Sequence, residues 1–99
     1  MALTSWAFIY TADGADPAGV VTDVDNGTCR SVFVGVPDVP SGIALAAALV
    51  DDGAQLIELC GGFGPIGTAQ VLEAIRHRIP VGSVGYGPES VDGVHDLFS

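Results

Sequence analysis

The residues whose types and spacing suit chemistry lie in one segment, Glu58-Leu59-Cys60-Gly61-Gly62-Phe63-Gly64-Pro65. Side chains alternate across a strand, so Glu58 and Cys60 are expected on one face, a carboxylate beside a thiol. Glycines leave backbone N–H groups bare, and a helix that begins at Pro65 would turn its positive end toward them. A helix N-terminus also favours the thiolate of a nearby cysteine. The segment predicts that Glu58 and Cys60 are catalytic, as a nucleophile or proton-transfer base beside an oxyanion site.

Each of these two residues also has a structural alternative. Cysteine is among the residues most often buried, so Cys60 could simply fit a tight place beside glycines. A carboxylate in an apolar strand is costly unless it is paired or in use, and Arg30 or a backbone N–H could pair with Glu58. The glycine pattern matches neither a phosphate-binding loop nor a dinucleotide fingerprint, so no cofactor is predicted. No metal-ligand spacing links the two histidines to Glu58 or the cysteines, so no metal site is predicted.

Further ligand contacts are predicted where strands end. The residues expected to bind a substrate are Tyr10, Asp38, Gly61, Gly62, Phe63, Gly64 and Tyr86. Each tyrosine closes a strand with an apolar ring and a polar tip, which is also common without function. Asp38 follows a strand and could instead serve in a turn or cap a helix. His77 is interpreted as a cap on a helix surface, and His95 as a packed or surface residue rather than a base.

The elements that must position these residues alternate between strand and helix. Strands are predicted at Trp6–Thr11, Ser31–Val36, Ala54–Cys60 and Val81–Tyr86. Helices are predicted at Val39–Asp52, from Gly64-Pro65 to Arg78, and from Pro88 onward, the last with an apolar stripe of Val91, Val94, His95 and Phe98. Asp16-Pro17 is typical of a helix start. The β-branched run Val20–Val24 that follows leaves three alternatives open, which are a short helix, an irregular loop or an extra strand.

This alternation predicts a single α/β domain over residues 1–99. Strands joined by helical crossovers form a parallel sheet that is covered on both faces. We therefore expect a small three-layer sandwich with four parallel strands in the order 2-1-3-4, similar to half of a flavodoxin or Rossmann fold. Ligands of such sheets bind beyond the carboxyl ends of the strands, where the glycine-rich segment is expected.

Composition limits the partners and the location. The net charge is −9, and only three residues are Lys or Arg, so binding to nucleic acid or to an anionic membrane surface is disfavoured. The sequence shows no signal peptide or membrane span, which predicts a cytoplasmic protein with free thiols. Apolar residues make up 48% of the chain and charged residues 15%. This leaves too little polar material to coat a small domain, so we expect a homo-oligomer, a dimer or larger.

Three segments carry a resemblance to a known family. They are Ser5-Trp6-Ala7-Phe8-Ile9-Tyr10, Val34-Gly35-Val36-Pro37-Asp38 and Gln55 through Pro65. Together they are similar to a small bacterial family of about this length that carries a domain-of-unknown-function label. The resemblance spans nearly the whole chain and departs from the family pattern between Gly19 and Thr28. It supports the fold and the location of the site and implies no particular activity.

Two functions from different classes fit these observations. The first is a cofactor-independent enzyme acting on a small carbonyl or carboxylate compound, in which Glu58 or Cys60 moves a proton and the glycine turn stabilises the enolate-like charge. Isomerases, epimerases, cyclases and lyases belong to this class. The second is a binding or assembly module that holds a small ligand, including an anionic one, or another subunit at the same turn without chemistry.

Overall fold

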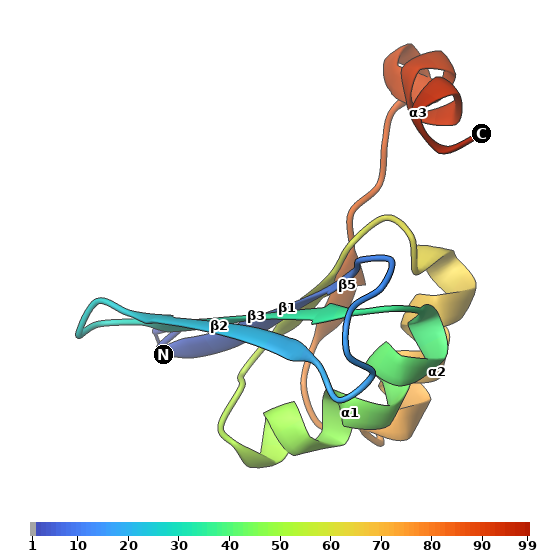
Figure 1. Ribbon diagram of the computed structural model, residues 1–99. Helices are drawn as coiled ribbons and strands as arrows, with labels where there is room; N and C mark the ends of the chain where they lie inside the picture. Colours follow the sequence, from blue (N-terminus) through green and yellow to red (C-terminus); the bar gives the residue numbers. More distant parts are fainter. Residues whose placement is uncertain (1) are drawn as a thin grey trace.

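A mixed five-stranded sheet organises the chain in the computed structural model, which describes residues 2–99 (Figure 1). In chain order the elements are β1 (Ser5–Thr11), β2 (Val20–Asp25), β3 (Arg30–Val36), α1 (Val39–Asp51), β4 (Ile57–Leu59), α2 (Gly64–Ala74), β5 (Val81–Ser83), the short 3-10 helix η1 (Pro88–Ser90) and α3 (Val91–Phe98). The strand order is β2-β3-β1-β4-β5, with β2 antiparallel to β3 and all other neighbours parallel. The predicted order of the four parallel strands is confirmed. The predicted number of strands is wrong, because the sheet has five strands rather than four, and β2 is the additional strand.

The sequence left three alternatives open for Val20–Val24, namely a short helix, a loop or an extra strand. The structure shows the extra strand, β2. Its β-branched residues favour extended backbone, and the turn that joins it to β3 is held by Asn26. The Asn26 side-chain oxygen accepts from the Thr28 N–H, the Thr28 hydroxyl and the Cys29 N–H at 2.8–3.0 Å. Gly27 completes the turn with a φ of 90°, which favours glycine. This local turn fixes an antiparallel hairpin.

The helix start predicted at Asp16-Pro17 is a turn. The Gly19 N–H donates to the Asp16 carbonyl oxygen at 2.8 Å, and the Ala18 N–H donates to the Asp16 carboxylate at 2.9 Å. An acid followed by proline suits a helix start, but it suits the first two positions of such a β-turn equally well. With no helical pattern after it, the turn leads into β2.

The prediction of three layers is wrong, because α1 and α2 lie side by side on one face of the sheet (Figure 1). Both helices belong to crossovers that run in the same direction across the sheet, from β3 past β1 to β4 and then to β5. Right-handed crossovers in one direction place their helices on one face. A helix between β1 and β3 would have covered the other face, but β2 takes its place at the sheet edge.

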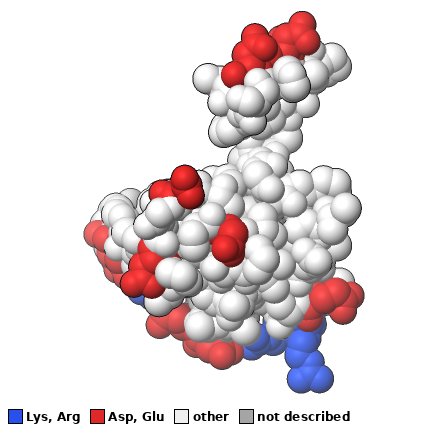
Figure 2. Space-filling model, turned by 45° about the vertical axis from the view of Figure 1, so that its right-hand side comes forward, with Lys and Arg blue, Asp and Glu red and all other residues white. Residues whose placement is uncertain are grey.

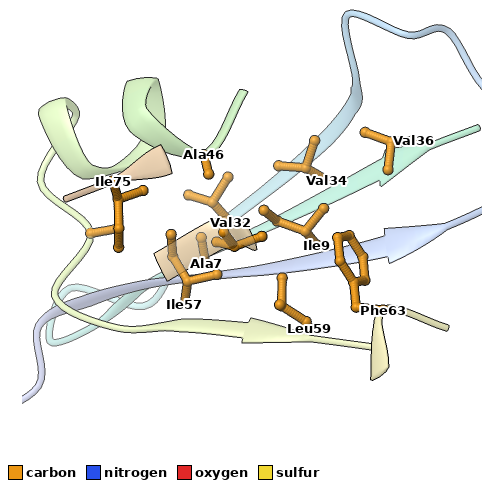
Figure 3. Close-up of a cluster of buried hydrophobic side chains, with 12 residues drawn as sticks. Ala7, Ile9, Val32, Val34, Val36, Ala46, Ile57, Leu59, Phe63 and Ile75 are labelled. Atoms are coloured by element: carbon orange, nitrogen blue, oxygen red, sulfur yellow. The ribbon is translucent and has the colours of Figure 1, made fainter. Parts of the chain in front are cut away.

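The hydrophobic core lies between the sheet and these two helices (Figure 3). Alternate residues of the strands point into it, and Ile9, Ile57 and Leu59 are fully buried. Side chains of this size each stabilise the folded state by about 1.5–3 kcal/mol when fully buried. We call this side of the sheet the covered face. The opposite side, the open face, carries the side chains Trp6, Phe8, Tyr10, Phe33 and Glu58.

Two elements end earlier than predicted. Helix α2 ends at Ala74 rather than Arg78, and Arg76 and His77 have φ values of 59° and 55°, which a helix cannot contain. Strand β5 ends at Ser83 rather than Tyr86, because the chain leaves the sheet edge through Gly85 and Gly87. The remaining residues carry α3 well beyond the carboxyl ends of the strands (Figure 1).

Candidate functional site

The sulfur of Cys60 is fixed at the carboxyl edge of the sheet by strand β1. The Cys60 N–H donates to the Ile9 carbonyl oxygen at 3.0 Å, which is the last rung of the ladder between β4 and β1. The next donor on β1 is the Thr11 N–H, and it lies 3.4 Å from Cys60 Sγ rather than bonding to a backbone carbonyl. The Thr11 hydroxyl oxygen lies 3.6 Å from the same sulfur. The thiol therefore ends the ladder and holds a defined position.

The turn after Cys60 is anchored by Phe63. Its N–H donates to the Cys60 carbonyl oxygen at 3.1 Å, and its ring is buried, at 5% exposure. The ring lies so close to Gly42 that a Cβ atom there would be 2.7 Å from Phe63 Cζ. Phe63 was predicted to contact a substrate. The structure places its ring in the core, where it positions the turn, and Phe63 is not among the residues that line the hollow described below.

The two glycines at the top of the turn are required by close neighbours. A Cβ atom at Gly61 would lie 3.0 Å from the Tyr86 ring, and one at Gly62 would lie 3.0 Å from the Thr11 hydroxyl oxygen. Within residues 2–99, the N–H groups of both glycines lack a hydrogen-bond acceptor from the protein. Helix α2 begins directly after this turn, at Gly64, with the positive end of its dipole toward it. The turn therefore has two backbone donors without a protein acceptor among the described residues.

A hollow of about 460 Å³ lies over this turn, and we call it the Cys60 hollow. Its lining residues are Thr11, Cys60, Gly61, Gly62, Tyr86, Val94 and Phe98. A second hollow of about 470 Å³ adjoins it and shares Gly61, Tyr86 and Val94. Gly64 and His95 line this second hollow. Of the predicted ligand-binding residues, Gly61, Gly62, Gly64 and Tyr86 thus lie at one place with Cys60.

Glu58 does not share the Cys60 hollow. Its side chain is exposed on the open face, between Phe8 and Gly82 in the strand register, and lines a separate hollow of about 310 Å³ with Leu56. The predicted pairing of a carboxylate with the thiol is therefore not formed. The pleat argument holds only within a strand, and β4 ends at Leu59, one residue before the thiol.

Tyr10 and Asp38 also lie apart from the Cys60 hollow. The Tyr10 ring lies over Gly35 on the open face, where a Cβ atom would be 2.9 Å from it, and stacks on Phe8 with ring centroids 6.3 Å apart. Asp38 caps α1, because its carboxylate accepts the Ser41 N–H at 2.8 Å. Hydrogen bonds from the side chain and backbone of Ser41 hold the pKa of Asp38 below its ordinary value.

Four residues near the site were not predicted to function there. Thr11 was treated only as the end of a strand, although its place beside the glycine segment follows from the predicted strand order. Val94, His95 and Phe98 belong to the predicted apolar stripe, and His95 was interpreted as a packed or surface residue rather than a base. The order of elements could not have shown that α3 stands over the strand ends.

Two further observations concern metals and membranes. Among residues 2–99, no three His, Cys, Asp or Glu side chains gather as metal ligands would. None of the helices described is both long enough and apolar enough to traverse a bilayer.

A mostly parallel sheet with a hollow at its carboxyl edge defines an α/β protein, a class whose members commonly bind their ligands at that edge. The chain belongs to the family of unknown function DUF6506, whose model matches residues 4–99. This confirms the resemblance drawn from the sequence to a family of unknown function. No curated protein and no solved structure matches the chain.

Proposed function

We propose that the protein is a cofactor-independent enzyme that moves a proton on a small carbonyl compound in the Cys60 hollow. The observation that carries this proposal is the held thiol: Cys60 Sγ accepts the Thr11 N–H at 3.4 Å and lines a hollow beside two glycines with free N–H groups. A fixed base beside oxyanion donors is the arrangement that enolate chemistry needs.

The proposed step begins with the sulfur of Cys60 as a thiolate. The thiolate takes a proton from the carbon next to the substrate carbonyl, and the electron pair of that C–H bond moves toward the carbonyl oxygen. The N–H groups of Gly61 and Gly62, or the Tyr86 hydroxyl, donate to the resulting oxyanion. Return of a proton to a different carbon gives an isomerase, and return of a proton to the opposite face of the same carbon gives an epimerase. Departure of a leaving group from the carbon next to the enolate, with its bonding electron pair, gives a lyase.

The lining of the hollow limits the substrate. Neither Lys nor Arg is among the described residues that line it, and the side chains opposite the turn are those of Val94 and Phe98. Figure 2 shows the basic groups gathered at the end of the molecule away from α3. An anionic group on the substrate would therefore depend on backbone N–H groups and the start of α2. A volume of about 460 Å³ suits a small metabolite.

A non-catalytic ligand-binding role is the second candidate, and the position of Glu58 favours it. Without that carboxylate, Cys60 and Tyr86 are the titratable groups among the described residues that line the hollow. A thiol and a glycine turn can hold a ligand without converting it.

Deuterium exchange separates these two functions. The protein is incubated in D2O with a panel of small aldehydes, ketones and keto acids, and the α-hydrogen signals are followed by proton NMR. Proton transfer predicts loss of these signals with at least one compound, at a rate reduced more than about 100-fold in Cys60→Ser. Cys29→Ser is the matched control, because Cys29 is also a free, partly buried thiol but lies on the β2–β3 hairpin. Equal exchange by the wild type and Cys60→Ser would contradict catalysis, and a compound that shifts protein signals without exchanging would support binding alone.

A further inference from the structure

The open face of the sheet is an aromatic surface that no helix within residues 2–99 covers. Trp6 and Phe33 meet edge to face with centroids 5.7 Å apart, and Phe8 lies 6.4 Å from Phe33. Tyr10 extends the row along β1. Parallel strands are almost always covered on both faces, and contiguous apolar patches mark contacts with other molecules. The open face therefore lacks a partner within the described part of the chain.

Helix α3 also lacks a packing partner for its apolar side within the described residues, because none of its own residues is buried. Leu97 and Phe98 are 79% and 81% exposed, and Val91 is 55% exposed. At 100° per residue, the apolar positions and His95 share a stripe about 160° wide, while Asp92 and Asp96 lie opposite it. A helix of eight residues is marginal in water unless its apolar side is packed. Its form thus implies a surface on which it rests.

We propose that α3 of one copy docks on the open face of a second copy, and that the two copies exchange this helix reciprocally to form a dimer. This inference goes beyond the proposed function and does not rest on it, because it concerns the face of the sheet opposite the core. Val94 and Phe98 belong both to the docking stripe of α3 and to the lining of the Cys60 hollow.

The course of the chain favours a second copy over the molecule's own open face. The Val84 N–H donates to the Leu59 carbonyl oxygen at 2.9 Å, so hydrogen bonding to β4 continues one residue beyond the end of β5. The chain then continues extended through Gly87, with φ −74° and ψ 169°, into the turn of η1. This extended segment carries α3 away from its own sheet (Figure 1). Exchange of an element across an extended link is a low-cost route to a dimer.

Charge and exposed apolar surface are compatible with this dimer. Each chain carries a net charge of −9, so contact between two copies is least unfavourable where the surfaces carry few acids. The apolar stripe of α3 carries none, and the aromatic row of the open face has one, Glu58 beside Phe8. The aromatic rings of the open face are already partly buried, so each contact removes from water the exposed parts of these rings together with Val91, Leu97 and Phe98. Because the exchange is reciprocal, the dimer forms this contact twice, as a two-fold interface does.

Light scattering after gel filtration gives the first test. The wild type is expected at twice the 10.0 kDa chain mass, and Leu97→Asp and Phe98→Asp are expected at the mass of one chain. Ile66→Asp is the matched control, because Ile66 is 76% exposed on α2 and takes no part in the proposed contact. Circular dichroism confirms that each variant is folded. A wild type that is monomeric at about 100 μM, or a Phe98→Asp variant that stays dimeric, would overturn the proposal.

The single tryptophan reports the docking surface itself. Trp6 lies on the open face, so docking of α3 shields it, and Phe98→Asp is expected to shift its emission to longer wavelength while Ile66→Asp does not. A monomer in which Phe98→Asp still shifts the emission would show α3 folding onto its own sheet and would overturn the second copy. If Phe98→Asp dissociates the dimer but leaves the Trp6 emission unchanged, α3 docks on another surface of the second copy. That result would overturn the open face as the docking site.

Discussion

The two faces of this sheet are built from alternate residues of the same strands, yet they differ in kind. On β1, Ile9 is fully buried beneath the helices, while its neighbours Phe8 and Tyr10 lie half-buried on the open face. Aliphatic side chains fill the covered face, and aromatic ones cross the open face. Because both crossovers run in one direction, one face receives two helices and the other receives none within residues 2–99. The covered face therefore supplies folding stability, and the open face is the one that we propose for association.

Substitutions at neighbouring positions of β1 should separate the two faces most strongly. Ile9→Ala leaves a cavity in the closed core, so it should lower the free energy of unfolding by roughly 2–5 kcal/mol. Phe8→Ala should cost about 1–2 kcal/mol at low protein concentration, because the ring is already partly in water. Urea unfolding at sub-micromolar concentration measures both. An equal cost at the two positions would show that the open face is part of the core.

Two glycine substitutions, one in helix α1 and one in the edge strand β5, extend the comparison of the two faces. A Cβ atom at Gly42 would lie 2.7 Å from Phe63 and 3.2 Å from Ile9, so Gly42→Ala should destabilise the protein by about 1–2 kcal/mol despite alanine's better helix propensity. A Cβ atom at Gly82 on the open face meets nothing within 4 Å, so Gly82→Ala should change stability by less than about 0.5 kcal/mol. Thermal unfolding compares the two variants. A stabilised Gly42→Ala would mean that the packing beneath α1 is loose.

A weaker effect is expected at Asp38, which begins α1 on the covered face. Its pKa is lowered in the folded state by Ser41, so its stabilising contribution is present above its ordinary value of 3.8 and is lost as the pH falls through the lower, folded value. In the variant Asp38→Asn, the asparagine side chain would still cap the helix but would not titrate. The stability of the wild type relative to this variant should therefore fall between about pH 5 and pH 3. A difference that is constant over this range would contradict the capping role.

The fold could be predicted from the sequence where patterns are local and repeated. The apolar runs and the proline and glycine punctuation indicated the four parallel strands in their correct order. The missing layer could not be predicted, because Asp16-Pro17 suits a turn and a helix equally, and only pairing with β3 decides that Val20–Asp25 is a strand. That one segment changes the fold from three layers to two.

The site could be predicted in part. The glycine turn and the place of Cys60 at a strand end were predicted from the sequence, because strand ends and glycine-rich turns can be recognised from residue types. The predicted pairing of Glu58 with Cys60 is wrong because β4 ends at Leu59. The length of a strand depends on the strands that pair with it, which residue types alone do not give. The position of α3 depends on the extended link through Gly87, which no local pattern reveals.

An isotope-filtered nuclear Overhauser experiment on a mixture of labelled and unlabelled chains would test the association of the open face directly. It detects contacts between protons of different copies only. A dimer that exchanges α3 should give cross-peaks between the Phe98 ring of one chain and the Trp6 and Phe33 rings of the other. Cross-peaks confined to single chains, or none from the aromatic rings of the open face, would contradict it.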